Sequence, residues 1–206
     1  MIAIIDYDAG NIRSVEKAMD KLGAEYILTR DPDTIKSADG VILPGVGAFG
    51  DAMEKLDSYG LRNVLTDYAS SNKPFLGICL GMQVLFESSE EAPGVKGLSI
   101  LPGNILRIKD EPGLKIPHMG WNSLIFHGEK GKLFANTADD SYVYFVHSYY
   151  LKAKDESIVK ASAQYGSTTI HASVEKNNVF GCQFHPEKSS RVGLGILSEF
   201  IKIVRG

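Results

Sequence analysis

Short apolar runs alternate with helix-like segments from the N-terminus to Cys79, and this alternation limits the fold more than any other feature of the sequence. The runs that predict strands are residues 2–5, 26–29, 41–43 and 74–79. Residues 11–22 carry apolar side chains at helical spacing, with Asn11 as the expected N-cap and Gly23 as the stop, and residues 61–69 predict a second helix. Nearly continuous apolar strands that alternate with helices are typical of a parallel sheet covered on both faces.

The C-terminal half contains short β-like pieces separated by turn residues, followed by one helix expected at residues 192–204. The β-like pieces are residues 99–101, 105–108, 123–126, 142–150, 158–163, 168–174 and 179–184. No linker rich in Pro, Gly or Ser and no internal repeat divides the chain. We therefore expect one α/β domain over residues 1–206, with a mixed, mostly parallel central sheet flanked by helices and with antiparallel strands added in the C-terminal half.

The composition excludes several classes of protein. Hydrophobic residues make up 44% and charged residues 23%, as in globular proteins, and a net charge of −3 without a basic stretch argues against binding to nucleic acid. No signal peptide or apolar membrane span is visible, and Cys79 and Cys182 do not form a disulfide framework, so we expect a soluble, cytoplasmic protein. The scattered histidines and the lack of C-x-x-C or H-E-x-x-H motifs predict neither a metal nor a cofactor.

Cys79 lies where a nucleophile is expected, in the segment Gly77-Ile78-Cys79-Leu80-Gly81. A nucleophile elbow needs small residues two positions before and two positions after the nucleophile, because the sharp turn from strand to helix leaves no room for side chains. The helix predicted at residues 82–86 would direct its N-terminus at the sulfur and favour the thiolate. A buried structural cysteine is the alternative interpretation. Cys182 is assigned to the core, because strand parity puts it on the opposite face from His185.

A cysteine nucleophile needs a base and a group that orients the base. His185 stands out among the histidines because Phe184-His185-Pro186-Glu187 follows a predicted strand. Side chains two positions apart in an extended segment point to the same side, so Glu187 would hold one imidazole nitrogen while the other faces Cys79. Pro186 would keep the backbone of His185 extended. A surface His-Pro turn is the alternative interpretation.

The turn Pro44-Gly45-Val46-Gly47 follows the third predicted strand. Its glycines would let backbone N–H groups point into a site, as an oxyanion hole requires. Gly45, Gly47 and Gly50 also fit the G-x-G-x-x-G pattern of dinucleotide binding. That pattern normally follows the first strand of a βαβ unit, which argues against dinucleotide binding here.

The segments around Cys79 and His185 resemble the class I (triad) glutamine amidotransferases, and the resemblance extends over the whole chain. It is carried by Gly77-Ile78-Cys79-Leu80-Gly81-Met82-Gln83 and Phe184-His185-Pro186-Glu187. Within this family, the chain is similar to the glutaminase subunits of histidine biosynthesis. The features that carry this second similarity are Asp6-Tyr7, Gly10-Asn11, Pro44-Gly45-Val46-Gly47, Met82, His118-Met119-Gly120-Trp121-Asn122, His147-Ser148-Tyr149 and Lys188.

The resemblance implies hydrolysis of L-glutamine to glutamate and ammonia through a glutamyl thioester. Cys79 would be the nucleophile, His185 the general acid and base, and Glu187 the residue that orients His185. The implied oxyanion hole consists of backbone N–H groups at Val46, Gly47 and Leu80. The implied substrate-binding residues are Gln83, Glu91, His147, Ser148 and Tyr149.

The resemblance also implies a heterodimer in which a (β/α)8-barrel synthase subunit receives the ammonia. The interface residues carried over from the family are Asn11, Trp121, Tyr144 and Lys188. Core packing of Trp121, inward packing of Tyr144 and plain solvent exposure of Lys188 are the alternatives. Because an uncoupled glutaminase would waste glutamine, we expect an allosteric switch in which a peptide of the turn at residues 44–47 flips when the partner and its ligand bind.

Three other functions compete with this interpretation. The chain could serve another amidotransferase, such as that of anthranilate or aminodeoxychorismate synthesis, although Met82 and the segment at residues 118–122 argue against it. It could be a cysteine hydrolase of another amide or of a γ-glutamyl peptide. It could also be a non-enzymatic regulatory domain, but such a domain has no need of Cys79, His185 and Glu187 together.

Overall fold

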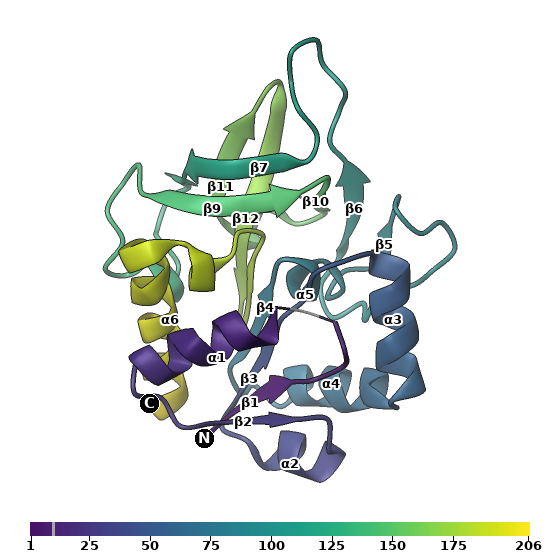
Figure 1. Cartoon of the computed structure of the whole chain (residues 1–206), viewed down its shortest axis with the longest axis vertical. Helices are drawn as coiled ribbons and strands as arrows, with labels where there is room; N and C mark the ends of the chain where they lie inside the picture. The colour runs from purple at the N-terminus through teal and green to yellow at the C-terminus, as the bar shows by residue number, and fades with distance from the viewer. Residues whose placement is uncertain (10) are drawn as a thin grey trace.

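The computed structural model describes residues 1–9 and 11–206 and consists of a central sheet with helices on both faces (Figure 1). Gly10, which is part of the family resemblance, lies outside the described residues. The central sheet has eight strands in the order β2-β1-β3-β4-β13-β12-β11-β8. The α/β class and the mixed sheet predicted from the sequence are confirmed.

The apolar runs of the sequence form the parallel part of this sheet. Its strands are β2 (Tyr26–Thr29), β1 (Ile2–Ile5), β3 (Gly40–Leu43), β4 (Phe75–Ile78) and β13 (Val179–Cys182). All of them except the edge strand β2 are buried along their whole length, as the near-continuous apolar sequences require. The antiparallel part consists of β12 (Thr168–Lys176), β11 (Val159–Tyr165) and β8 (Ile125–Phe126).

Alternate residues of β1 face two different helical layers. Ile2 and Ile4 belong to a core with residues of α1 (Ile12–Lys21) and α6 (Ser190–Arg205). Ala3 and Ile5 belong to a second core, which includes residues of α2 (Pro32–Ser37), α3 (Phe49–Ser58) and α4 (Leu61–Ser70). The sequence predicted α1, α4 and α6 but neither α2 nor α3. Asn11 occupies the N-cap position of α1, yet its side chain makes no capping hydrogen bond.

The C-terminal strands do not all join the central sheet, so that expectation was wrong in part. A separate three-stranded sheet contains β10 (Tyr149–Ala153), β6 (Gly103–Arg107) and β5 (Ser88–Ser89). A two-stranded ladder contains β7 (His118–Ser123) and β9 (Tyr142–His147). The single strand predicted at residues 142–150 is therefore divided at Ser148, whose carbonyl accepts a hydrogen bond from the N–H of Ile108 (2.9 Å).

Two local predictions fail because turns replace regular structure. Residues 99–101 form no strand: Ser99 has φ 54°, and the N–H groups of Ile100 and Leu101 both donate to the carbonyl of Leu85. The helix expected at residues 82–86 is instead the short α5 (Leu80–Gln83). The remaining elements are the 3-10 turns η1 (Lys132–Phe134), η2 (Glu156–Ile158) and η3 (Pro186–Lys188). Within the described part of the chain, no helix combines the length and the apolarity that crossing a membrane requires.

Candidate active site

Cys79 occupies a strained position between β4 and α5. Its φ of 54° and ψ of −112° lie outside the regions that a residue with a side chain ordinarily adopts. The backbone holds this conformation, because the N–H of Cys79 donates to the carbonyl of Cys182 (2.7 Å) and its carbonyl accepts from the N–H of Met82 (3.0 Å). Strain of this kind clusters at functional sites, and here it turns the sulfur out of the sheet.

The two glycines of the elbow are required by close backbone contacts. A Cβ atom on Gly81 would lie 1.8 Å from the carbonyl oxygen of Leu43, and a Cβ atom on Gly77 would lie 2.7 Å from the carbonyl oxygen of Gly81. Both distances are below any normal contact, and both involve backbone that has no freedom to withdraw. The expectation that the turn around Cys79 leaves no room for side chains at positions 77 and 81 is therefore confirmed.

Gly81→Ala is expected to destabilise the protein by about 3 kcal/mol or more, because the added methyl group overlaps the backbone of β3. Gly195→Ala is the matched control: Gly195 lies in α6 with nothing within 4 Å of its added Cβ, so alanine there should stabilise the helix by roughly 0.5–1 kcal/mol. Urea unfolding of both variants measures the difference. Equal stability of Gly81→Ala and the wild type would contradict the close approach.

His185 and Glu187 form a buried pair next to Cys79. The Nδ1 atom of His185 lies 2.7 Å from Oε1 of Glu187, and both side chains are almost completely buried. Burial by itself lowers the pKa of His185, but the contacts of the ring with Cys79 and Glu187 outweigh burial and raise the pKa to about 10. Among the described residues, Nε2 of His185 has no hydrogen-bond partner, so it remains available for proton transfer.

The pair predicted from the sequence therefore lies together, although the path of the chain differs from the extended segment expected. His185 is extended, as the following proline requires, but residues Pro186–Lys188 form the 3-10 turn η3. The turn brings the carboxylate of Glu187 back to the ring of His185. Sequence spacing identified the correct partner through the wrong local geometry.

Ser189 holds the backbone of His185, and the sequence analysis missed it. Its hydroxyl donates to the carbonyl of His185 (2.6 Å) and accepts from the N–H of Tyr144 (2.9 Å), while the N–H of His185 donates to the carbonyl of Tyr144 (2.9 Å). These bonds attach the segment that carries the imidazole to β9. No sequence pattern points to Ser189, because its second partner, Tyr144, lies 45 residues away in the chain.

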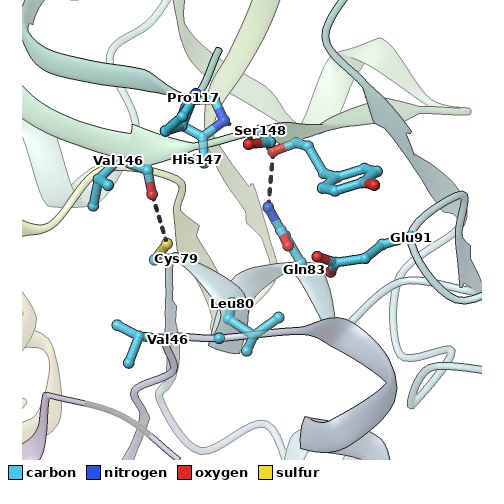
Figure 2. Close-up of a pocket in the computed structure, with 11 residues that line it drawn as sticks. Val46, Cys79, Leu80, Gln83, Glu91, Pro117, Val146, His147 and Ser148 are labelled. Carbon is cyan, nitrogen blue, oxygen red and sulfur yellow. Dashed lines mark hydrogen bonds between the residues drawn. The ribbon is translucent and has the colours of Figure 1, made fainter.

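A cavity of about 260 Å³ opens above Cys79 (Figure 2). Its size suits a small molecule rather than a polymer. Its lining includes every residue predicted for the oxyanion hole and for substrate binding, and adds Pro117 and Val146. The complete lining is Val46, Gly47, Cys79, Leu80, Gln83, Glu91, Pro117, Val146, His147, Ser148 and Tyr149.

The polar groups of this cavity are held by specific bonds. Glu91 accepts a hydrogen bond from the N–H of Phe49 (2.8 Å), the first residue of α3, so its carboxylate lies at a helix N-terminus. Nε2 of Gln83 donates to the carbonyl of Tyr149 (2.9 Å), and the thiol of Cys79 faces the carbonyl of Val146 at 4.0 Å (Figure 2). The cavity thus brings a carboxylate, an amide and a sulfur together.

The carboxylate of Glu91 lies at the N-terminus of α3, the helix that follows the glycine turn, and this argues against dinucleotide binding. A dinucleotide would place its pyrophosphate at the N-terminus of that helix. Here the Glu91 carboxylate accepts from Phe49 in that position. Among residues 1–9 and 11–206, no group of three or more His, Cys, Asp or Glu side chains is arranged to hold a metal ion.

His147 lines the cavity, and His118 lies directly behind it. Nδ1 of His118 lies 3.1 Å from Nε2 of His147, and Nδ1 of His147 lies 2.8 Å from the carbonyl oxygen of Tyr149. Burial lowers the pKa of His118 to about 4 and that of His147 to about 3. Both rings are therefore uncharged at neutral pH.

The protein is expected to lose stability as the pH falls from about 6.5 toward 4. In that range the unfolded chain protonates His118 and His147 while the folded chain does not, so each contributes a loss of up to about 1.4 kcal/mol per pH unit. His185 does not oppose this trend, because a group with a raised pKa is protonated in both states below pH 6.5. Urea unfolding at a series of pH values measures the slope.

The variant His118→Gln should reduce this slope, since it removes one of the buried histidines whose pKa is lowered in the folded protein. His127→Gln, at an exposed histidine, is the matched control and should keep the wild-type slope. An identical slope for His118→Gln and the wild type would mean that His118 is charged in the folded protein.

Two of the four residues predicted for a partner interface, Trp121 and Tyr144, lie on an exposed surface rich in apolar side chains. Trp121 is 52% exposed and stands edge-on to Tyr144, with ring centroids 6.2 Å apart, so the core alternative for Trp121 is wrong. Met119 and Tyr142, on the same face of the β7–β9 ladder, are more than half exposed. We call Met119, Trp121, Tyr142 and Tyr144 the ladder face. Asn11 and Lys188 are half-buried and lie outside it.

A sequence model of the glutamine amidotransferase class-I family matches residues 3–203 of the chain. The chain belongs to this family. It is 49% identical over 205 residues to the imidazole glycerol phosphate synthase subunit HisH of Methanothermobacter thermautotrophicus, with both chains covered completely. It is 50% identical to the subunit of that name in Bacillus subtilis, over 98% of this chain and 96% of the relative, and 53% identical to that of Bacillus cereus, over 99% and 95%.

Solved structures agree with this amidotransferase fold. A crystal structure of a glutamine amidotransferase superposes with a TM-score of 0.77 at 17% identity and covers both chains completely. A glutamine amidotransferase from Thermotoga maritima superposes with a TM-score of 0.68 at 16% identity, over 100% of this chain and 98% of the other. At such low identity, these two likenesses concern the class I amidotransferase fold alone.

Proposed function

We propose that this chain is the glutaminase subunit of an imidazole glycerol phosphate synthase and that residues 1–206 act as one amidotransferase domain. The main support for the proposal is sequence identity: over nearly its whole length, the chain is 49%, 50% and 53% identical to three HisH subunits of that synthase. The cavity at Cys79 supports it, because a cysteine, a buried histidine and a carboxylate are the groups that amide hydrolysis through a thioester needs. The ammonia released would serve histidine biosynthesis in the partner subunit.

In the first half of the reaction, the Cys79 thiolate attacks the side-chain amide carbon of L-glutamine. A C–S bond forms, and the negative charge moves to the amide oxygen, where backbone N–H groups at Val46, Gly47 and Leu80 would stabilise it. His185, whose pKa is raised to about 10, holds the proton that the leaving nitrogen needs. The C–N bond breaks, ammonia departs, and a glutamyl thioester remains on Cys79.

In the second half, the neutral imidazole of His185 removes a proton from water, which attacks the thioester carbon. The C–S bond breaks, glutamate leaves, and Cys79 returns as the thiolate with the proton on His185. Glu187 holds Nδ1 of the ring in both halves, so that Nε2 always exchanges the proton. Proton and electron pair are both restored at the end of the cycle.

The far side of the cavity suits the amino-acid end of glutamine. The carboxylate of Glu91 would pair with the substrate ammonium group. The NH2 group of Gln83 donates to Tyr149 and Gln183, and its amide oxygen would accept a hydrogen bond from the substrate. His147, Ser148 and Tyr149 also line the cavity. The pairing of Glu91 with the substrate predicts that changes at Glu91 act mainly on KM.

The partner is the synthase subunit, which we propose to be a (β/α)8 barrel that docks on the ladder face together with Asn11 and Lys188. An exposed cluster of Met, Trp and Tyr side chains is typical of an interaction surface. Docking there would also shift the equilibrium of the peptide flip proposed for the turn at residues 44–47. In this turn Gly47 adopts a φ of 104° and the side chain of Val46 is exposed, so the backbone has room to change conformation. The two cysteines, Cys79 and Cys182, are both free thiols, which is consistent with a protein located in the reducing cytoplasm.

Glutamine turnover by the purified chain tests the proposal. Glutamate is measured for the chain alone, with the synthase subunit, and with the synthase subunit plus its ribotide ligand. We expect the rate to rise at each step. Absence of glutamate under all three conditions would overturn the glutaminase assignment, while coupling only to an anthranilate or aminodeoxychorismate synthase would overturn the pathway. Equal rates under all three conditions would contradict the proposed allosteric switch and leave the glutaminase assignment valid.

A further inference from the structure

Gln183 lies against the reacting sulfur, and the mechanism above does not use it. It follows directly after β13 and is completely buried, with its N–H bonded to the carbonyl of Ala172 (2.9 Å). Its side-chain nitrogen Nε2 lies 3.7 Å from Sγ of Cys79. A polar side chain without exposure costs stability unless it is hydrogen-bonded, so its placement beside a nucleophile calls for an explanation.

The neighbouring amide determines which end of Gln183 faces the sulfur. Gln83 must direct its NH2 group at the carbonyl of Tyr149, because a carbonyl oxygen only accepts hydrogen bonds. The second hydrogen of that NH2 group reaches Oε1 of Gln183, 3.0 Å away. The oxygen of Gln183 is thereby turned toward Gln83, and its nitrogen is turned toward Cys79. Rotating the Gln83 amide by half a turn would set two acceptors against each other, and rotating the Gln183 amide would set two NH2 groups against each other.

The carbonyl of Tyr149 is itself held in place from the ladder. It accepts from Nδ1 of His147 (2.8 Å), which leaves Nε2 of His147 to accept from Nδ1 of His118 (3.1 Å). Nε2 of His118 is then the acceptor for the side-chain amide of Asn122 (3.4 Å). All these bonds have one possible direction when both imidazoles are neutral. The side-chain amide of Gln183 is therefore the last member of a series of hydrogen bonds that begins at Asn122 on β7 and ends at the sulfur of Cys79.

The sulfur of Cys79 has two opposed neighbours. The carbonyl of Val146, 4.0 Å away, accepts from the thiol and repels a thiolate, whereas the N–H of Gln183 prefers the thiolate as an acceptor. The titratable groups around the sulfur are His185 with Glu187 behind it, Tyr7, and His147 and Glu91 in the cavity. Gln183 is the one uncharged side chain among the described residues that donates to the sulfur.

We propose that Gln183 is a further catalytic residue, which donates a side-chain N–H to Sγ of Cys79 and stabilises the thiolate before attack and again when the thioester breaks. The bond weakens in between, because the sulfur of a thioester carries no charge. This inference rests on the proposed function for its role in turnover. The contact with the sulfur itself does not depend on the substrate.

Alkylation of Cys79 by iodoacetamide as a function of pH tests the contact, with the label located by mass spectrometry. In Gln183→Met, which keeps the length of the side chain without its donor, the midpoint of the alkylation profile should move up by about one pH unit, and glutamine turnover at neutral pH should fall about tenfold or more in kcat. Gln183→Glu keeps an acceptor for Gln83 and should move the midpoint further, since its carboxylate repels the thiolate.

Cys182→Ala is the matched control. Cys182 is the neighbour of Gln183 at the same strand end and equally buried, but it belongs to the core, so its removal should leave the midpoint unchanged. Thermal unfolding identifies any variant that fails to fold, and Gln183→Glu then replaces Gln183→Met. A wild-type midpoint in a folded Gln183 variant would overturn the inference. Failure of the wild type to hydrolyse glutamine would overturn the proposed function and leave the alkylation result valid.

Discussion

Cys79→Ala is expected to abolish glutamine hydrolysis, with a loss of about 10⁴-fold or more, while the protein keeps its fold. No other group in the cavity can form the thioester, because Cys182 is completely buried and burial raises the pKa of its thiol to about 12. Alanine removes one sulfur atom at a site where the backbone is already held by Cys182 and Met82. Glutamate release measures the loss of activity, and thermal unfolding shows whether the fold is kept.

The matched control for this variant is Cys182→Ala, which should retain glutaminase activity. A glutamine analogue with an electrophilic side chain should label the wild type at Cys79 alone. Ammonia supplied from outside should still support the synthase reaction in a complex with Cys79→Ala, because the proposed synthase subunit would carry out that reaction. Labelling at Cys182, or substantial turnover by Cys79→Ala, would refute the assignment of the nucleophile.

His185→Ala is expected to reduce turnover almost to the background, by about 10⁴-fold or more, and Glu187→Gln should retain about 10²-fold more activity than His185→Ala. Without its carboxylate partner the imidazole still reaches the sulfur part of the time, but it loses one of the two contacts that raise its pKa to about 10. The pH profile of Glu187→Gln should therefore change along with kcat.

Replacement of the exposed His127 by glutamine provides the control for this pair of variants and should leave turnover unchanged. Full activity of both His185→Ala and Glu187→Gln would mean that another group is the base. His147 is a poor substitute, because both of its ring nitrogens are occupied, one by His118 and one by the carbonyl of Tyr149. The expectation is therefore specific to His185.

The parallel strands and the cysteine elbow could be predicted because their signals are local. A strand buried on both faces has a continuous apolar sequence, and an elbow needs glycines at set distances from the nucleophile. Helix α3 had a usable signal that was missed: Phe49, Ala52, Met53 and Leu56 are spaced as one helical face. Helix α2 buries little more than Ile35, so its sequence carried no comparable pattern.

The remaining parts of the site depend on contacts between distant segments. Ser189 matters because β9 passes beside it, and Gln183 because the amide of Gln83 determines its orientation. The division of the predicted strand at Ser148 follows from pairing with two different partners, β7 and β6. None of these relations leaves a period or a motif in the local sequence.

Strand β9 has a consequence for anyone who would redesign the assembly. Tyr144 contributes its ring to the ladder face and its backbone to the segment that carries His185, and Val146, which pairs with the exposed Met119, directs its carbonyl at the sulfur of Cys79. The proposed partner surface and the residues around the reacting sulfur therefore share one stretch of main chain. New partner specificity would be safer to engineer at the tips of Met119 and Trp121 on the opposite strand, since substitutions that move the backbone of β9 alter turnover as well as recognition.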